Sequence, residues 1–182
     1  MELRSVLDKI SKALREAEID HALIGGLALA THGVTRATFD LDLLVDGERD
    51  EDVDRISRAM GYECLHRTQH VANYASQDPK LGRVDFLFTR RAHGKGMLSR
   101  ARPDPAMAGD LPRVVDAADL IGLKVQAYSN DPKRRCQDLA DIQRLLQSAR
   151  ELDLERVREY FRIFDREQEL EDLLTRIIHE VP

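Results

Sequence analysis

Two aspartates, Asp40 and Asp42, stand one residue apart inside an apolar stretch of the chain. Side chains alternate between the faces of a β-strand, so the pattern predicts a strand that carries both carboxylates and Leu44 on one face. The opposite face receives the apolar set Phe39, Leu41, Leu43 and Val45 and is expected to face the core. Adjacent carboxylates repel each other and are costly to bury unpartnered, and a divalent cation would supply the partner. The alternative is a strand with a solvated, acidic face.

A glycine pair precedes this strand. Residues 22–24 predict a short buried strand, Gly25 and Gly26 predict a tight turn, and a helix is expected from Leu27 to about His32. Glycine permits positive φ and lets another group approach the backbone closely, and free amides at the start of a helix attract phosphate. Because Mg²⁺ is often held by carboxylates together with substrate phosphates, the turn and the acidic strand together suit a nucleoside triphosphate. Taken alone, the glycines fit a plain strand-to-helix turn equally well.

A second acidic strand follows at residues 83–88. Val84, Phe86 and Phe88 alternate with Asp85 and Leu87, so Asp85 is a single carboxylate on a strand whose other face is apolar. The pattern repeats that of the first acidic strand. The alternative is an acid on an edge strand in water.

Gly25-Gly26 with Arg36, Thr38, Asp40 and Asp42 resembles the opening motif of the nucleotidyltransferase superfamily, the DNA polymerase beta-like fold. The resemblance is closest to the abortive-infection and type IV toxin nucleotidyltransferases, the AbiEii-like group, and it covers about residues 20–148. Most superfamily members have Gly-Ser at the turn. The Gly-Gly variant removes a hydroxyl, so backbone amides must supply more of any phosphate contact. The implied fold is α/β (α+β): a small mixed β-sheet flanked by helices, with a C-terminal helical extension.

The resemblance also assigns roles to individual residues. It implies that Asp40, Asp42 and Asp85 are catalytic and hold metal ions, with Asp85 activating the acceptor hydroxyl. It implies nucleotide contacts from Gly25, Gly26, Arg36, Thr38 and Lys124. Arg36 could instead brace Asp40 or Asp42 as an ion pair. Lys124 lies among the core positions of a helix expected from Asp116 to Tyr128, where a lysine is uncommon unless it snorkels or meets an acid. Asp138 is expected to orient Lys124 or Arg36.

The remaining segments predict how this core is extended. We expect a nucleotidyltransferase domain at residues 1–148 and a helical hairpin at 149–182 packed on it as one compact unit, with a homodimer interface as the alternative use of the hairpin. Residues 89–113 have the glycines and prolines of a loop and no periodic pattern. Residues 80–113 hold eight basic and three acidic side chains, so this stretch could face a polyanion or be a solvated loop.

Composition sets further bounds. The chain has 182 residues, 42% hydrophobic and 34% charged, which suits a globular protein with no membrane span. The net charge of −5 argues against nonspecific coating of nucleic acid. Cys64 and Cys136 lack metal-ligand spacing, and reduced thiols in a cytoplasmic protein are the default interpretation.

These observations predict a transferase that uses Mg²⁺ (or Mn²⁺) to move a nucleoside monophosphate from a nucleoside triphosphate such as ATP to a hydroxyl acceptor, releasing pyrophosphate. RNA, for example a tRNA 3′ end, is one acceptor that the resemblance implies, and an antibiotic hydroxyl is another. The toxin half of a toxin–antitoxin pair, with an antitoxin partner, is a further expectation. The alternative is a catalytically silent module that binds nucleotide or a partner with the same fold.

Overall fold

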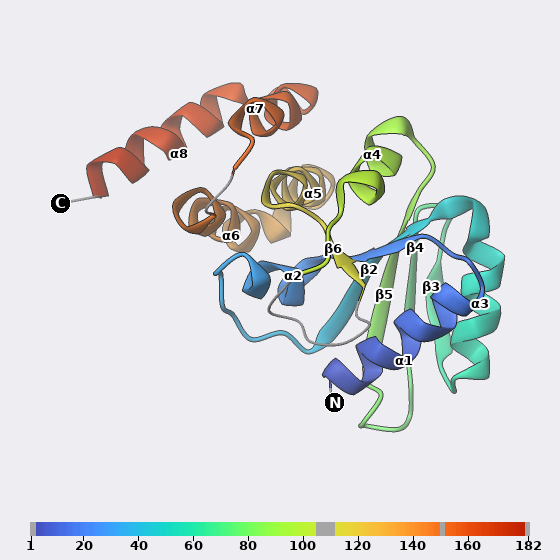
Figure 1. Cartoon of the computed structure of the whole chain (residues 1–182). Helices are drawn as coiled ribbons and strands as arrows, with labels where there is room; N and C mark the ends of the chain where they lie inside the picture. Colours follow the sequence, from blue (N-terminus) through green and yellow to red (C-terminus); the bar gives the residue numbers. More distant parts are fainter. Residues whose placement is uncertain (1–2, 105–111, 150–151, 181–182) are drawn as a thin grey trace. The chain divides into compact units, whose positions relative to one another are not determined.

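The computed structural model describes residues 3–104, 112–149 and 152–180. Internal contacts divide the chain into two units. The first unit comprises residues 1–28 and 36–115 and contains the sheet (Figure 1). The second comprises residues 29–35 and 116–182 and is helical. The division falls inside α2 (Gly25–Thr31), so the chain enters the second unit briefly before it returns to the first.

The strands of the first unit are β1 (His21–Leu23), β2 (Asp40–Asp46), β3 (Glu63–Arg67), β4 (Val71–Ala75), β5 (Arg83–Thr89) and β6 (Arg113–Val114). Within the described residues they form one mixed sheet in the order β3-β4-β5-β2-β1-β6. β2 and β5 are parallel neighbours at its centre, while β1 pairs with β2 in the antiparallel sense. Because β5 lies between β4 and β2, Asp85 is not on an edge strand.

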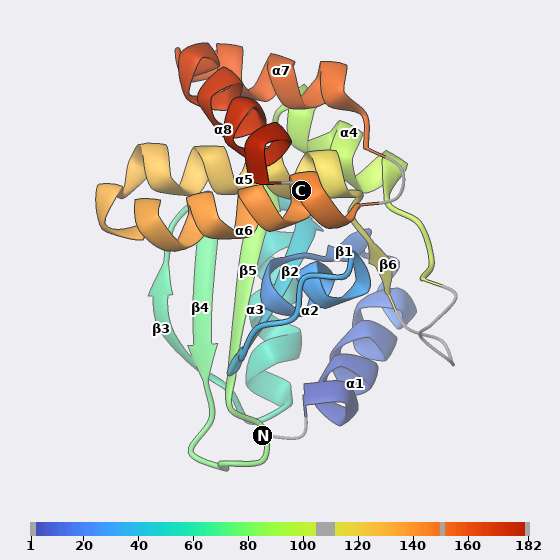
Figure 2. The same cartoon turned by 90° about the vertical axis from the view of Figure 1, so that its left-hand side faces the viewer.

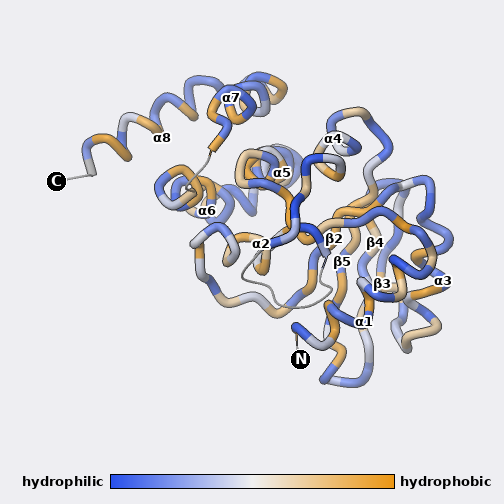
Figure 3. Tube along the Cα trace, viewed as in Figure 1, coloured by the Kyte–Doolittle hydropathy of each residue, from blue (hydrophilic) through white to orange (hydrophobic). Residues whose placement is uncertain are grey.

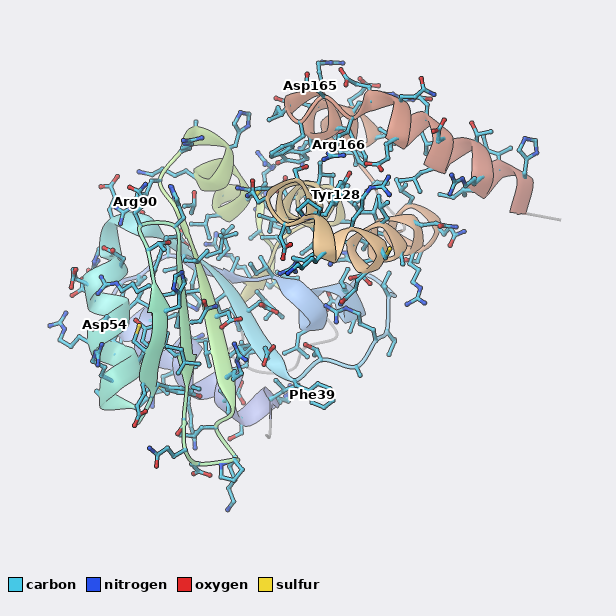
Figure 4. All side chains as sticks on the ribbon, turned by 180° about the vertical axis from the view of Figure 1, so that it is seen from behind. Phe39, Asp54, Arg90, Tyr128, Asp165 and Arg166 are labelled. Atoms are coloured by element: carbon cyan, nitrogen blue, oxygen red, sulfur yellow. The ribbon has the colours of Figure 1, made fainter. Side chains whose placement is uncertain are left out.

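The helices of the first unit are α1 (Leu3–Glu16), the short 3₁₀ helix η1 (Gly47–Arg49), α3 (Asp50–Ala59) and α4 (Ala92–Arg100), with the start of α2. α1 and α3 contact each other; α1 also contacts β2, and α3 contacts β3. The Tyr74 hydroxyl of β4 donates to Oδ1 of Asp54 on α3 at 2.8 Å. Asp54 is labelled in Figure 4. The strand positions on this face are buried: Leu41, Leu43, Val45, Ala72, Tyr74, Val84, Phe86 and Phe88. Figure 3 shows hydrophobic residues along β2, β4 and β5, in agreement with this apolar core.

Two predictions for the first unit are wrong. Phe39 does not face the core: its side chain is 81% exposed (Figure 4), because β2 begins only at Asp40 and the alternation does not extend to the preceding residue. Residues 92–100 form the helix α4 within the predicted loop. Gly94 is required there, since a Cβ at this position would fall 2.0 Å from Oγ1 of Thr89. The glycine that looked like a turn signal lets the helix pack on β5.

The second unit consists of α5 (Ala117–Asn130), the 3₁₀ helix η2 (Pro132–Arg134), α6 (Arg135–Ser148), α7 (Leu154–Ile163) and α8 (Glu167–Glu180). Asp116 is the N-cap of α5, and its carboxylate accepts a hydrogen bond from the Asp119 amide at 2.8 Å. α5 packs along α6 and α7 (Figure 2). Gly122 allows the close contact with α7, because a Cβ there would fall 2.6 Å from the ring of Tyr160.

The C-terminal helical extension that the sequence predicts is present as α7 and α8. The Arg166 guanidinium stacks 4.8 Å from the ring centroid of Tyr128 on α5 (Figure 4). The division of the chain at residue 148 stays a prediction. Cys64 and Cys136 are free thiols. Of the helices in the described part of the chain, none has the length and apolar character needed to cross a membrane.

Candidate active site

The start of α2 lies directly against the Asp42 carboxylate of β2: the helix begins at Gly25, two residues before the expected start at Leu27, so the two glycines form its first turn. Gly25 has φ +65°, a left-handed conformation that glycine adopts without strain. A Cβ at Gly25 would fall 2.0 Å from Oδ2 of Asp42, and one at Gly26 would fall 2.6 Å from Oγ1 of Thr38. The Ile24 amide donates to the Asp42 carbonyl oxygen at 3.1 Å. Both glycines therefore make room for side chains that the sequence places in the site.

Asp42 and Asp85 lie opposite each other on neighbouring strands. They are Cα partners in the parallel pair of β2 and β5, and residues paired in this way point to the same face of the sheet. Both side chains are partly exposed, whereas Leu43 and Phe86, the next pair along, are buried on the opposite face. The structure thus brings together the two carboxylates that the sequence placed on separate strands.

Asp40 lies on the same face, two residues before Asp42, at the start of β2. Its cross-strand partner is Arg83, whose Nε lies 3.8 Å from Oδ1 of Asp40. The two side chains are 42% and 52% exposed, so this ion pair contributes little to stability. A basic side chain from β5 therefore flanks the carboxylate at the entrance to the strand.

Arg36 and Thr38 occupy the segment that leads into β2. The Thr38 hydroxyl donates to the Asp40 carbonyl oxygen at 3.3 Å, and Nη1 of Arg36 donates to the Ala37 carbonyl oxygen at 3.3 Å. With Thr38 packed on Gly26, this segment is fixed against the start of α2. The phosphate contact and the bracing role of Arg36 both stay predictions.

The carboxylate oxygens of Asp40, Asp42 and Asp85 suit Mg²⁺ chemically, because this cation prefers oxygen ligands. Among residues 3–104, 112–149 and 152–180, no three or more His, Cys, Asp and Glu side chains form a group that could hold a metal ion. Mg²⁺ is normally held by one or two carboxylates with water and substrate phosphates, not by an all-protein cage. The pair Asp42 and Asp85 fits that mode, and the three-carboxylate metal set stays a prediction.

Lys124 lies in the second unit, where two carboxylates hold its ammonium group. Nζ is 2.9 Å from Oδ1 of Asp138 and 2.7 Å from Oδ2 of Asp141, and the lysine side chain is 9% exposed. The lysine thus meets an acid, as its core position required. Asp138 contacts it as expected, but sequence reasoning missed Asp141. The sequence does contain an indication of Asp141: it lies three residues after Asp138, so both acids are on the same, buried side of α6.

The basic stretch at residues 80–113 is partly neutralised, since at least four of its eight basic side chains form ion pairs in the described residues. Arg83 pairs with Asp40, Arg90 with Asp50, Lys95 with Glu48 and Arg113 with Asp20. At least half of the eight basic side chains in this stretch are therefore matched by a carboxylate. Residues 105–111 of this stretch lie outside the described residues.

A mixed sheet with paired carboxylates on its central strands and a glycine turn beside them defines the nucleotidyltransferase fold. The family model "Nucleotidyl transferase AbiEii toxin, Type IV TA system" matches residues 6–181, so the chain belongs to the AbiEii nucleotidyltransferase family and is a nucleotidyltransferase. Among curated proteins, no sequence gives a significant match.

Solved structures share this fold. The antibiotic-resistance factor ANT(2'')-Ia in solution is 19% identical with a TM-score of 0.67, over 99% of this chain and 100% of that one. The lincosamide adenylyltransferase LnuA with lincomycin is 13% identical with a TM-score of 0.56, over 78% of this chain and 94% of that one. A nucleotidyltransferase-like protein from Paracoccidioides brasiliensis is 17% identical with a TM-score of 0.57, over 96% and 92%. At these identities the likeness extends to the fold alone.

Proposed function

We propose that the protein transfers a nucleoside monophosphate from a nucleoside triphosphate to a hydroxyl acceptor with the help of Mg²⁺ (or Mn²⁺), and that it releases pyrophosphate. The observation that carries this proposal is the register of β2 and β5, which sets Asp42 opposite Asp85. The packing of the Asp42 carboxylate against Gly25 supports it, because the carboxylate then adjoins the turn to which we assign the phosphates.

The reaction needs positioning and charge compensation more than covalent participation by the protein. Asp85 accepts the proton of the acceptor hydroxyl. The hydroxyl oxygen bonds to the α-phosphorus, the bond from that phosphorus to the bridging oxygen breaks, and pyrophosphate leaves with the electron pair. Gly25 and Gly26 seat the phosphates through backbone amides.

Asp40 and Asp42, with Asp85, would hold the metal. A bound Mg²⁺ supplies charge neutralisation at the phosphate oxygens. Arg36 and Thr38 adjoin this group at the start of β2, and the planar guanidinium of Arg36 suits phosphate oxygens. Lys124 belongs to the proposal as a further positive charge for the nucleotide, although Asp138 and Asp141 already hold its Nζ.

The acceptor is proposed separately. The family's description as a type IV toxin supports a cellular acceptor such as RNA, for example a tRNA 3′ end, and an antitoxin partner in the cytoplasm. The full-length match to ANT(2'')-Ia, for which a complex with adenylyl-2''-tobramycin is known, supports an antibiotic hydroxyl as the second candidate. A homodimer through the C-terminal helices remains part of the proposal.

The test is transfer from each of four [α-³²P]-labelled nucleoside triphosphates with Mg²⁺, using tRNA, tobramycin and lincomycin as acceptors. Asp42→Asn should lower the rate by about 10²–10⁴-fold, as loss of a group that acts on the reacting atoms commonly does. Asp8→Asn, an exposed position on α1 of the same unit, is the matched control and should keep the wild-type rate. Transfer by Asp42→Asn at the wild-type rate would refute the assignment.

The alternative function, a silent binding module, predicts a different result. Calorimetry would then show nucleoside triphosphate binding that does not change when Mg²⁺ is removed, and no pyrophosphate would form with any acceptor. On the proposal made here, removal of Mg²⁺ with a chelator weakens nucleotide binding and abolishes transfer.

A further inference from the structure

The row of side chains that contains Asp42 and Asp85 continues across two more strands. Asn73 of β4 is the Cα partner of Asp85, and His66 of β3 is the Cα partner of Asn73. Paired residues share a face, so His66, Asn73, Asp85 and Asp42 form one line across four strands. Neighbouring strands lie about 4.8 Å apart. The backbone of Asn73 is therefore one strand spacing from the backbone of Asp85, and the backbone of His66 is about two strand spacings from it.

A β-bulge is what brings His66 onto this face. Cys64 pairs with Tyr74 and His66 pairs with Asn73, so Leu65 is the extra residue between them. Without the bulge Leu65 would oppose Asn73, and His66 would point to the face that α3 covers. Bulges often re-aim a side chain next to an active site.

Contacts on the opposite face confirm this orientation. Arg67, the residue after His66, has Nη2 3.2 Å from Oδ2 of Asp50 and 2.9 Å from Oε1 of Glu51, both on α3. Tyr74, the residue after Asn73, donates to Asp54 of the same helix. Since successive residues point to opposite faces, Asn73 and His66 point to the face of Asp42 and Asp85.

Neither side chain is engaged within the fold. In the described part of the chain, the Asn73 amide is partly exposed, the His66 ring is exposed, and neither has a hydrogen bond or ion pair to another residue. An amide and an imidazole both donate and accept hydrogen bonds. Groups of this kind match the hydroxyls of a sugar, each of which also donates and accepts.

We propose that Asn73 and His66 form the acceptor subsite, in which they hydrogen-bond the hydroxyls of a sugar whose attacking hydroxyl lies against Asp85. This inference rests on the proposed function. Its geometry separates two roles along one line: Asp42, beside Gly25, faces the nucleotide, and Asn73 and His66, beyond Asp85, face the acceptor. The sugar can belong to a small molecule or to an RNA end, and the test distinguishes these sources.

The experiment measures initial transfer rates for wild type, Asn73→Ala and His66→Ala, with the triphosphate that wild type uses best and with tRNA, tobramycin or lincomycin. Each alanine variant should raise KM for the acceptor by about tenfold, because a hydrogen bond to the substrate is lost. KM for the triphosphate should change by less than about twofold, because that binding is made elsewhere in the site. His66→Gln keeps a donor and an acceptor and should restore much of the affinity.

His70→Ala is the matched control. It removes the same ring from an exposed position four residues away, in the turn between β3 and β4. It should leave both KM values and the thermal midpoint of unfolding unchanged. The acceptor that responds to the variants identifies the source of the sugar.

Two results would overturn the subsite while nucleotidyl transfer stands. One is an unchanged acceptor KM, or an equal rise in both KM values, in the two alanine variants. The other is a wild-type protein that releases pyrophosphate with water as the acceptor but transfers to none of the three sugars. A wild-type protein that binds no triphosphate and releases no pyrophosphate would instead refute the proposed function.

Discussion

The two units of this protein differ in how their aspartates are buried and paired. Asp138 and Asp141 of the helical unit are almost completely buried, and both contact the ammonium of Lys124 at under 3 Å. Asp42 and Asp85 of the sheet unit are partly exposed and lie opposite each other, with the Asp42 carboxylate against a glycine. The first arrangement completes its charge balance within the fold. The second sets two like charges side by side on a partly exposed face of the sheet, and it is the face to which the proposed function assigns the nucleotide and its cation.

The largest effect that tests this contrast is expected at Lys124. Lys124→Met should lower the free energy of unfolding by about 3–5 kcal/mol, because it removes the ammonium group that the two buried carboxylates of Asp138 and Asp141 share. Chemical denaturation followed by circular dichroism measures the loss. The triple variant Lys124→Met, Asp138→Leu, Asp141→Leu should recover much of the stability, since buried apolar replacements of ion pairs are often neutral.

The same variants separate structure from function at Lys124. If the triple variant is stable and still binds the triphosphate as wild type does, the nucleotide contact proposed for Lys124 is excluded. If it is stable and its triphosphate KM rises, the lysine acts on the nucleotide as well as on α6.

A smaller effect is expected at the glycine turn. Gly25→Ala places a methyl group 2.0 Å from Oδ2 of Asp42 at a position with φ +65°, so strain of about 1–3 kcal/mol adds to displacement of the carboxylate. Transfer activity should fall more than stability does, which parallel rate and denaturation measurements would detect.

Gly61→Ala is the control for the backbone strain that a side chain causes at a positive φ. Gly61 also has positive φ, +86°, yet a Cβ there meets nothing within 4 Å. This variant should lose stability to the backbone strain and keep its activity. Equal losses of activity in the two variants would contradict a specific role for the contact between Gly25 and Asp42.

The smallest effect concerns pH. Burial lowers the pKa of His21 on β1, although a hydrogen bond between its Nδ1 and the Ile19 carbonyl oxygen at 2.8 Å opposes the shift. The folded state therefore binds this proton less readily than the unfolded chain, where the pKa is about 6.5. The contribution of His21 to the free energy of unfolding is fully present above that pH. It falls as the pH drops toward the folded-state pKa, by at most about 1.4 kcal/mol per pH unit.

Denaturation curves at pH 7.5 and 5.5 measure this dependence. His21→Phe should reduce the loss of stability between pH 7.5 and pH 5.5. His70→Ala, which changes an exposed residue, should not reduce it. A wild-type dependence that survives His21→Phe unchanged would assign the effect to other groups.

Much of the sheet could be predicted from the sequence, because alternation defines β2 and β5 from their apolar faces alone. The expected mixed sheet with flanking helices is confirmed. α4 was missed because Gly94 and Gly96 resemble turn signals, and only the packing of Gly94 on Thr89 explains a helix there. Phe39 was misplaced because periodicity does not define where a strand begins.

The site could be predicted only in part, for a related reason. The spacing of Asp40 and Asp42 puts them on one face, but their alignment with Asp85 depends on strand order, which local patterns do not contain. The line that adds Asn73 and His66 depends further on a bulge at Leu65. Nothing in the local sequence marks that extra residue. Asp141 could have been found as an acid at a core position of α6.

The path of the chain between the two units limits how the protein can be divided. Residues 29–35 belong with residues 116–182, and the Ser148 hydroxyl donates to the His32 carbonyl oxygen at 3.1 Å. A chain truncated after Val115 would keep residues 29–35 but lose the C-terminal helices of the same unit. Leu29, which is fully buried, would then be exposed. Exchange of C-terminal halves between homologues would meet the same obstacle, because a seven-residue segment would have to be exchanged with them. Recombination in this lineage should therefore preserve residues 29–35 and the C-terminal helices as a matched set.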